Sequence, residues 1–281
     1  MSTGAALKVT SHVGRDLLQS AQLFRHEHAV VWEYVSNGLQ YKDPGTKPTV
    51  VVNIDAKSKK IQIRDSGRGM LFLDLQRYFQ MHGENLDRQQ GRPGRGYFGT
   101  GKSAAFGIAN SLAITTVRDR RLSKVRLTRQ DISSRPDGDE IPVQVLEREV
   151  RTGSPNGTLV EIEDIFLRHI DIASIIRHVE RHIAHWPDAS VIVNNHECEF
   201  TEPDINREVR IATKGTEYER LLGDTTLVIK VAKAPLDHFK EWSAKLKYYL
   251  DPQDALVDIR QNLDELSKAF ASVWSVTGVI R

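Results

Sequence analysis

The chain has 281 residues, enough for one large domain or two ordinary ones and for a substantial buried core. Its 39 basic residues nearly balance its 37 acidic ones and 40% of its residues are hydrophobic, which excludes a disordered or polybasic protein. A single cysteine excludes an internal disulfide, and the absence of a signal peptide or a long apolar run predicts a cytoplasmic protein with no membrane partner.

The first hundred residues alternate between helical and strand patterns. Apolar side chains recur at helical spacing over residues 17–39 and predict one helical region. Residues 49–54 and 60–64 are rich in β-branched side chains around a polar turn and predict a hairpin, and residues 71–81 predict a helix. Six glycines and three arginines fill residues 82–101, so a long functional loop is expected there.

The rest of the chain continues with helices and strands in blocks. After a short helix of small residues at 103–110, the patterns predict strands at 112–116, 124–128, 143–150 and 158–163, a helix at 171–185 and a strand at 190–193. A weaker signal beyond residue 205 predicts a strand at 225–231 and helices at 237–249 and 254–274. The order predicts an α+β fold with one domain at 1–205 and an extension at 206–281.

The most conspicuous motif is Gly-Tyr-Phe-Gly-Thr-Gly-Lys-Ser at residues 96–103, which matches the P-loop pattern G-x-x-x-x-G-K-[ST]. In a P-loop NTPase the lysine reaches phosphates and the serine binds magnesium. A buried strand must then lead directly into the first glycine, yet residues 85–95 are polar, basic and interrupted by Pro93. The context argues against a P-loop, which stays as an alternative in which the lysine is essential.

Two upstream motifs carry other chemistry. Glu33 and Asn37 are four residues apart and share one helix face, where they can activate a water and hold a hydrated magnesium ion. Asp65-Ser-Gly-Arg-Gly-Met70 directly follows a predicted strand. Its glycines permit a close approach to a flat ligand, and its aspartate can accept a hydrogen bond from an exocyclic amine. A solvated helix face and a plain turn are the alternatives when each motif is taken alone.

In chain order these motifs resemble the GHKL, or Bergerat-fold, ATPase superfamily, which includes the ATPase domains of DNA gyrase B, MutL and the large heat-shock chaperone. The resemblance covers about residues 12–200. It implies a two-layer sandwich, with helices on a mixed, mostly antiparallel sheet, and a small C-terminal α/β extension that is a shortened transducer-like region. It also implies that residues 82–101 are a lid over ATP, so that the glycine-rich motif ends the lid and is not a P-loop.

The resemblance implies a role for each motif residue. Glu33 corresponds to the general base that activates the attacking water, and Asn37 corresponds to the magnesium ligand. Asp65 corresponds to the aspartate that reads the adenine amino group. The other implied nucleotide-binding residues are Gly67, Gly69, Met70, Gly96, Gly99, Thr100, Gly101, Lys102 and Thr158.

The implied function is Mg²⁺-dependent binding and slow hydrolysis of ATP, which closes the lid and drives a conformational or dimerisation switch. The alternative is a nucleotide-sensing interaction module that binds ATP without useful turnover. The implied partners are ATP, a second copy of the chain in a nucleotide-dependent homodimer, and a protein or nucleic acid. A basic cluster favours either nucleic-acid contact or a solvated strand face; it consists of Arg118, Arg120, Arg121, Lys124, Arg126 and Arg129.

Overall fold

The computed structural model describes residues 7–9, 14–43, 45–79, 100–134, 141–202, 204–216, 219–224 and 226–233. The chain divides into two compact units, Met1–Phe200 and Thr201–Arg281, and each is described by itself. The helices predicted at 237–249 and 254–274 lie outside the described residues. So does the predicted lid, apart from its last two residues.

The first unit is built on one nine-stranded sheet. Its strands are β1 (Leu7–Val9), β2 (Thr49–Asp55), β3 (Lys60–Asp65), β4 (Ala109–Arg118), β5 (Arg121–Thr128), β6 (Ile141–Arg151), β7 (Gly157–Ile165), β8 (Ser190–Val193) and β9 (His196–Cys198). They lie in the order β1-β6-β5-β4-β7-β3-β2-β8-β9. Each neighbouring pair is antiparallel except β2 and β8, which are parallel. The predicted mixed, mostly antiparallel sheet is confirmed.

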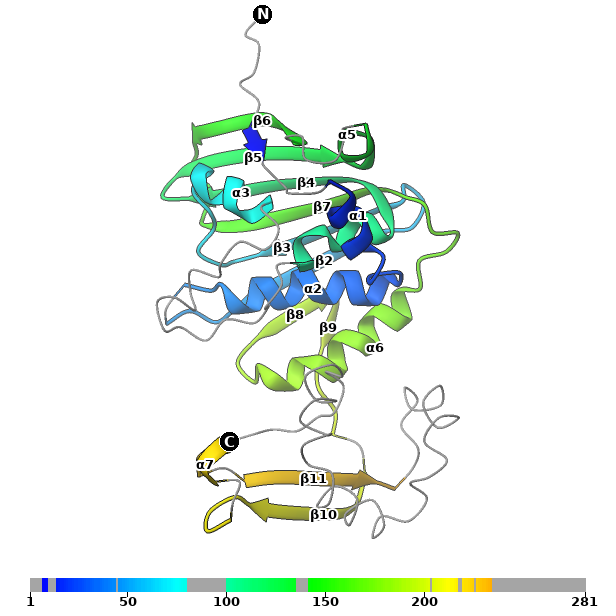
Figure 1. The fold of residues 1–281 in the computed structure, drawn as a ribbon, viewed down its shortest axis with the longest axis vertical. Helices are drawn as coiled ribbons and strands as arrows, with labels where there is room; N and C mark the ends of the chain where they lie inside the picture. The colour runs from blue at the N-terminus through cyan, green and yellow to red at the C-terminus, as the bar shows by residue number, and fades with distance from the viewer. Residues whose placement is uncertain are drawn as a thin grey trace, which may run out of the picture. The chain divides into compact units, whose positions relative to one another are not determined.

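Helices form the second layer. They are α1 (Gly14–Ala21), α2 (Glu27–Gln40), α3 (Phe72–Phe79), the 3₁₀-helix η1 (Thr100–Gly107), the short α5 (Arg129–Ser133), α6 (Ile172–His182) and the 3₁₀-turn η2 (Ile183–His185). Figure 1 shows α1, α2, α3 and η1 in front of the sheet, and α6 packs against α2. The predicted two-layer α+β sandwich is therefore confirmed.

The core lies between these two layers. Residues of β2 alternate between buried and exposed, so Val50 and Val52 face the helices. On α2, Val31, Val35 and Leu39 recur at helical spacing and are fully or almost fully buried in the same cluster. Burial of each such side chain contributes about 1.5–3 kcal/mol, which holds α2 on strands β2 and β3.

The opposite face of the sheet carries a ladder of ion pairs. Lys60 Nζ lies 2.8 Å from Glu161 Oε1 and 2.9 Å from Glu163 Oε1. Lys124 lies 3.5 Å from Glu161, and Arg126 lies 3.4 Å from Glu163. The two members of the basic cluster on this face of β5 are therefore neutralised by acids on β7. This pairing favours the solvated strand face over nucleic-acid contact.

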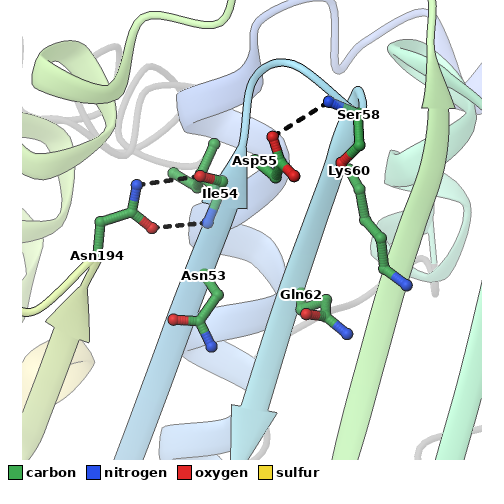
Figure 2. A pocket seen from close by; sticks show the side chains of 7 residues that line it. All are labelled: Asn53, Ile54, Asp55, Ser58, Lys60, Gln62 and Asn194. Carbon is green, nitrogen blue, oxygen red and sulfur yellow. Dashed lines mark hydrogen bonds between the residues drawn. The ribbon is translucent and has the colours of Figure 1, made fainter.

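The Asn194 side chain joins the β8–β9 turn to the neighbouring strand β2. Asn194 and Asn195 have φ angles of 46° and 67°, the left-handed conformation that a two-residue hairpin turn of type I′ requires. The side-chain Oδ1 of Asn194 accepts a hydrogen bond from Ile54 N at 2.7 Å, and its Nδ2 donates one to Ile54 O at 3.1 Å (Figure 2). In effect the side chain extends the parallel pairing of β2 with β8 by one residue.

Two predicted elements are wrong in detail. The single helical region over residues 17–39 is two helices, because the chain turns at residues 22–26 so that α1 can pack on η1 while α2 packs on the sheet. The junction is tight: an added Cβ on Gly107 would lie 1.9 Å from Phe24 O. The helix predicted at 103–110 is a 3₁₀-helix that ends earlier, because Ala109 already pairs with β7.

The second unit contains an antiparallel pair of strands. They are β10 (Ile205–Ala212) and β11 (Thr226–Ala232), and the short helix α7 (Glu219–Leu222) lies between them in the chain. The strand predicted at 225–231 is confirmed as β11, whereas β10 was not expected from the sequence. Across the described part of both units, no helix has the length and apolar character needed to span a membrane.

Candidate functional site

The first part of the candidate site is one face of α2. Glu33 and Asn37 lie one above the other there, and Asn37 Nδ2 donates a long hydrogen bond of 3.5 Å to Glu33 Oε1. Burial raises the pKa of the Glu33 carboxyl. The hydrogen bond from Asn37 lowers this pKa, but it offsets only part of the rise. The carboxylate is therefore a stronger base than an exposed glutamate, and its orientation is set by a neighbour on its own helix.

The start of η1 lies directly against this carboxylate. An added Cβ on Gly101 would lie 1.7 Å from Glu33 Oε1, so only glycine fits at that position as η1 stands. Four residues later, Ala105 N donates a hydrogen bond of 3.2 Å to the hydroxyl of Tyr34, which is almost fully buried. Because α2 and η1 are joined at both points, the backbone of η1 is held in register with Glu33.

The second part of the site is Asp65 at the end of β3. Its Oδ1 accepts hydrogen bonds from Gly67 N at 2.8 Å and from Thr158 N at 3.1 Å. Burial raises the pKa of Asp65, and these two hydrogen bonds oppose that shift. Within the described ranges, the hydrogen bonds to this carboxylate all go to Oδ1. Oδ2 is thus the atom that can accept from a ligand.

The loop after Asp65 is fixed on the ends of β4 and β7. Gly69 has φ +66°, and an added Cβ there would lie 1.9 Å from Val117 O. Met70 N donates to Thr116 Oγ1 at 2.8 Å, and Thr116 Oγ1 donates in turn to Gly157 O at 3.4 Å. The completely buried Thr116 side chain therefore links the glycine loop to the start of β7 through these two hydrogen bonds.

Gly38 brings the two parts together. An added Cβ on this α2 residue would lie 2.8 Å from Asp65 Cβ, so the helix and the end of β3 are in direct contact. Sequence reasoning missed Gly38, although a glycine inside a helical pattern is unfavourable and indicates close packing. It also missed Thr116, for which the sequence holds no signal because only the strand register places it beside Met70.

The remaining predicted residues are only partly described. Gly96 and Gly99 lie outside the described residues, and Thr100 and Lys102 are placed by their backbone in η1. The P-loop alternative requires the mainly parallel sheet of α/β proteins, and the single parallel pairing of β2 with β8 does not provide it. The glycine-rich motif instead ends on η1, beside Glu33.

The donor set is compatible with magnesium. No group of three or more His, Cys, Asp or Glu side chains in the described part of the chain is arranged to hold a metal. Mg²⁺ is commonly held by one or two protein oxygens together with phosphate oxygens and waters, and not by an all-protein cage. Asn37 turns its amide nitrogen to Glu33, so its Oδ1 remains as one such oxygen.

Two cavities of about 340 Å³ each lie away from these motifs. The first is at the end of the β2–β3 hairpin (Figure 2), where Asp55 Oδ1 accepts from Ser58 N at 3.1 Å and the Lys60 ammonium is paired with two glutamates. Its polar groups are therefore largely committed to the protein itself. The second lies at the C-terminal end of η1. The motif residues carry the chemistry, so we place the candidate site at Glu33 and Asp65.

Comparison with known proteins agrees with this geometry. Residues 24–153 match the family model of the histidine kinase-, DNA gyrase B-, and HSP90-like ATPases, and a search of curated proteins gave no match. The matched segment contains the Glu33–Asn37 and Asp65–Met70 motifs and all of η1, and Thr158 lies just beyond it. The two-layer sandwich, the motif order and this match all support the resemblance to the GHKL ATPase superfamily, and residues 24–153 are the part of the chain that is similar to its ATPase domains.

Proposed function

We propose that the protein binds ATP with Mg²⁺ and hydrolyses it slowly to drive a conformational or dimerisation switch. The observation that supports this most is the contact between Glu33 and Gly101. It puts a partly buried carboxylate of raised pKa against the segment at which the predicted lid ends. A nucleotide whose phosphates lie at the start of η1 would thus have a general base beside it.

Adenine recognition is assigned to Asp65. Its Oδ1 is held by two backbone N–H groups, and its Oδ2 would accept a hydrogen bond from the adenine amine. Gly67 and Gly69 lack side chains where the base would lie, and Met70 would provide an apolar contact. Thr158 contributes through the backbone N–H that orients the carboxylate.

Phosphate binding is assigned to the start of η1. Free backbone N–H groups at a helix start favour an anion, so the amides of Thr100, Gly101 and Lys102 are the proposed contacts, with Gly96 and Gly99 contributing from the lid. Asn37 would hold Mg²⁺, which neutralises phosphate charge when bound. Glu33 would take a proton from the attacking water, a role that typically contributes about 10²–10⁴-fold in rate.

The test separates an ATPase from the alternative, a nucleotide-sensing module that binds ATP without useful turnover. ATP binding is measured by calorimetry and hydrolysis by phosphate release, for the wild type and for Glu33→Gln. We expect similar affinities and a rate at least about 10²-fold lower in the variant. Glu197→Gln, an exposed change on β9, is the matched control and should alter neither quantity.

Two outcomes would count against this assignment. Equal phosphate release by the wild type and Glu33→Gln, above the blank, would mean that another residue is the base. Tight binding of ATP by a wild type that releases no phosphate would favour the sensing module.

The proposed switch is lid closure over residues 82–101, followed by homodimer formation. Hydrogen exchange of this segment without nucleotide, with ADP and with a non-hydrolysable ATP analogue tests closure, and mass measurement tests association. Protection that rises only with the triphosphate supports the switch, and equal protection in all three states contradicts it.

Residues 206–281 are proposed to pass the change to a partner as a shortened transducer. The cytoplasmic location stays a prediction from the sequence.

A further inference from the structure

The cavity at the C-terminal end of η1 is lined by charged and aromatic side chains. It measures about 340 Å³, and its lining includes Arg25, Arg129 and Phe166. Four segments that are distant in sequence build it: the α1–α2 connection, the end of η1, the start of α5, and the residues just after β7. None of these residues takes part in the proposed ATP site.

Two guanidinium groups line this cavity without an acidic partner in the described part of the chain. Arg25 Nε donates to Gln22 O at 3.1 Å, and Arg129 Nη1 donates to Phe106 O. These backbone contacts hold the side chains in place, and no acidic side chain among the described residues compensates their positive charge. Arg121 and Arg126 on the preceding strand β5 do pair with glutamates, so the unpaired state of the two cavity arginines is a local feature.

An exposed aromatic ring lies beside these charges. Phe166 is 51% exposed, and its ring centroid is 5.6 Å from the Arg129 guanidinium carbon. Its backbone N–H donates to Ile108 O at 3.0 Å, which anchors the residue at the end of β7. A ring exposed next to a fixed positive charge provides an apolar surface and an anion-binding group within one cavity.

The base of the cavity is rigid. Gly107 packs so closely on the α1–α2 connection that an added Cβ would lie 1.9 Å from Phe24 O and 2.5 Å from Ala21 O. Phe106, the residue before it, is almost fully buried in the core. A ligand would therefore meet a largely preformed surface and lose little free energy in ordering it.

We propose that this cavity binds an acidic segment of a partner protein, with a carboxylate between Arg25 and Arg129 and a neighbouring apolar side chain on Phe166. Charge complementarity favours an acidic ligand, and arginine and aromatic residues are enriched in protein interfaces. A protein segment is favoured over a small acid because a further exposed apolar side chain follows a cavity-lining residue in the chain. Leu23, next to the cavity-lining Gln22, is 75% exposed and would be covered by further residues of the segment.

The probe is a panel of four fluorescein-labelled octapeptides in which glutamate or aspartate alternates with phenylalanine or leucine. Binding to the full chain without nucleotide is followed by fluorescence anisotropy. Each peptide is compared with its amide form, in which glutamine or asparagine replaces the acid. We expect at least one acidic peptide to bind about tenfold more tightly than its amide form, and less tightly at high salt.

Three variants locate the binding. Arg25→Gln and Phe166→Ser change exposed side chains and should each weaken the peptide by about tenfold, while Arg129→Lys keeps the charge but loses the fork geometry and should weaken it less. Arg177→Gln, an exposed arginine on α6 outside the cavity, is the matched control and should leave binding unchanged.

Equal binding of acidic and amide peptides would overturn the proposal, as would unchanged affinity in Arg25→Gln. So would a panel in which no peptide binds up to millimolar concentration. Phenylacetate is titrated in parallel, and if it binds as tightly as the best peptide, the ligand is a small acid and not a protein segment. Because all measurements are made without nucleotide, they do not depend on the proposed ATPase activity.

Discussion

The assignment of Asp65 as the adenine-reading residue leads to a quantitative prediction for Asp65→Asn. Asparagine has the same shape and retains an oxygen that can accept from Gly67 N and Thr158 N. With that oxygen fixed, the amide NH₂ must occupy the position of Oδ2. A hydrogen-bond donor then faces the adenine amine, which is also a donor.

The expected loss follows from this mismatch. A buried donor without an acceptor costs about 1–3 kcal/mol, which corresponds to roughly a 5- to 150-fold loss of ATP affinity. The free protein should not lose stability in parallel. Burial raises the pKa of Asp65, which means that the charged carboxylate is held at a desolvation cost that a neutral amide avoids. The free energy of unfolding of Asp65→Asn should therefore equal or exceed that of the wild type at neutral pH.

The assay combines titration of a fluorescent ATP analogue with urea unfolding of the same samples. Asp55→Asn is the matched control, since it makes the same change on an exposed residue at the other end of the β2–β3 hairpin. It should leave the affinity unchanged. An affinity of Asp65→Asn within twofold of the wild type would refute the adenine assignment, and a loss of folding stability would show that the carboxylate is structural.

Three further predictions concern one residue each on η1, β4 and α2. Gly101→Ala should lower ATP turnover by at least about tenfold, because the new Cβ would lie 1.7 Å from Glu33 Oε1 and overlap the carboxylate. Full phosphate release by this variant would mean that η1 moves freely away from α2. Thr116→Val should weaken ATP binding by roughly 5- to 150-fold, because Met70 N loses its buried acceptor, and Thr116→Ser should keep the wild-type affinity. Equal calorimetric affinities for the wild type, Thr116→Val and Thr116→Ser would contradict the role of Thr116 in holding the glycine loop. Burial is the main cause that lowers the pKa of His28 from its ordinary value of 6.5. The unfolded chain therefore binds a proton there more readily than the folded chain, so the contribution of His28 to stability is present above pH 6.5 and is lost as the pH falls. Urea unfolding between about pH 7.5 and about pH 5.5 should show this loss, and it should be smaller in His28→Gln.

The hairpin strands β2 and β3 were predictable because each is half-buried, whereas the short strands β1 and β9 were not predicted. Residues of β2 and β3 alternate between core and surface, and that period of two is visible in the sequence. The break between α1 and α2 was not predictable in the same way. Apolar spacing continues through residues 22–26, and the turn is imposed by the contact of Phe24 with Gly107, which is distant in sequence.

The same contrast holds for the candidate site. The spacing of Glu33 and Asn37 and the glycines after Asp65 are local patterns, so the sequence was sufficient to single them out. The contact that joins Glu33 to Gly101 depends on how α2 and η1 pack together on the sheet. No local pattern contains that information, and only the resemblance to a family connected the two segments in advance.

The position of β7 has a practical consequence for making this protein in pieces. The family match ends at residue 153, four residues before β7 begins, yet β7 lies between β4 and β3 in the sheet. A fragment cut at residue 153 would split the sheet into β1-β6-β5-β4 and β3-β2, each with a long unpaired edge open to other chains. The same cut would remove the Thr158 N–H from Asp65. A fragment meant to fold alone should therefore extend to about Phe200, where the first compact unit ends.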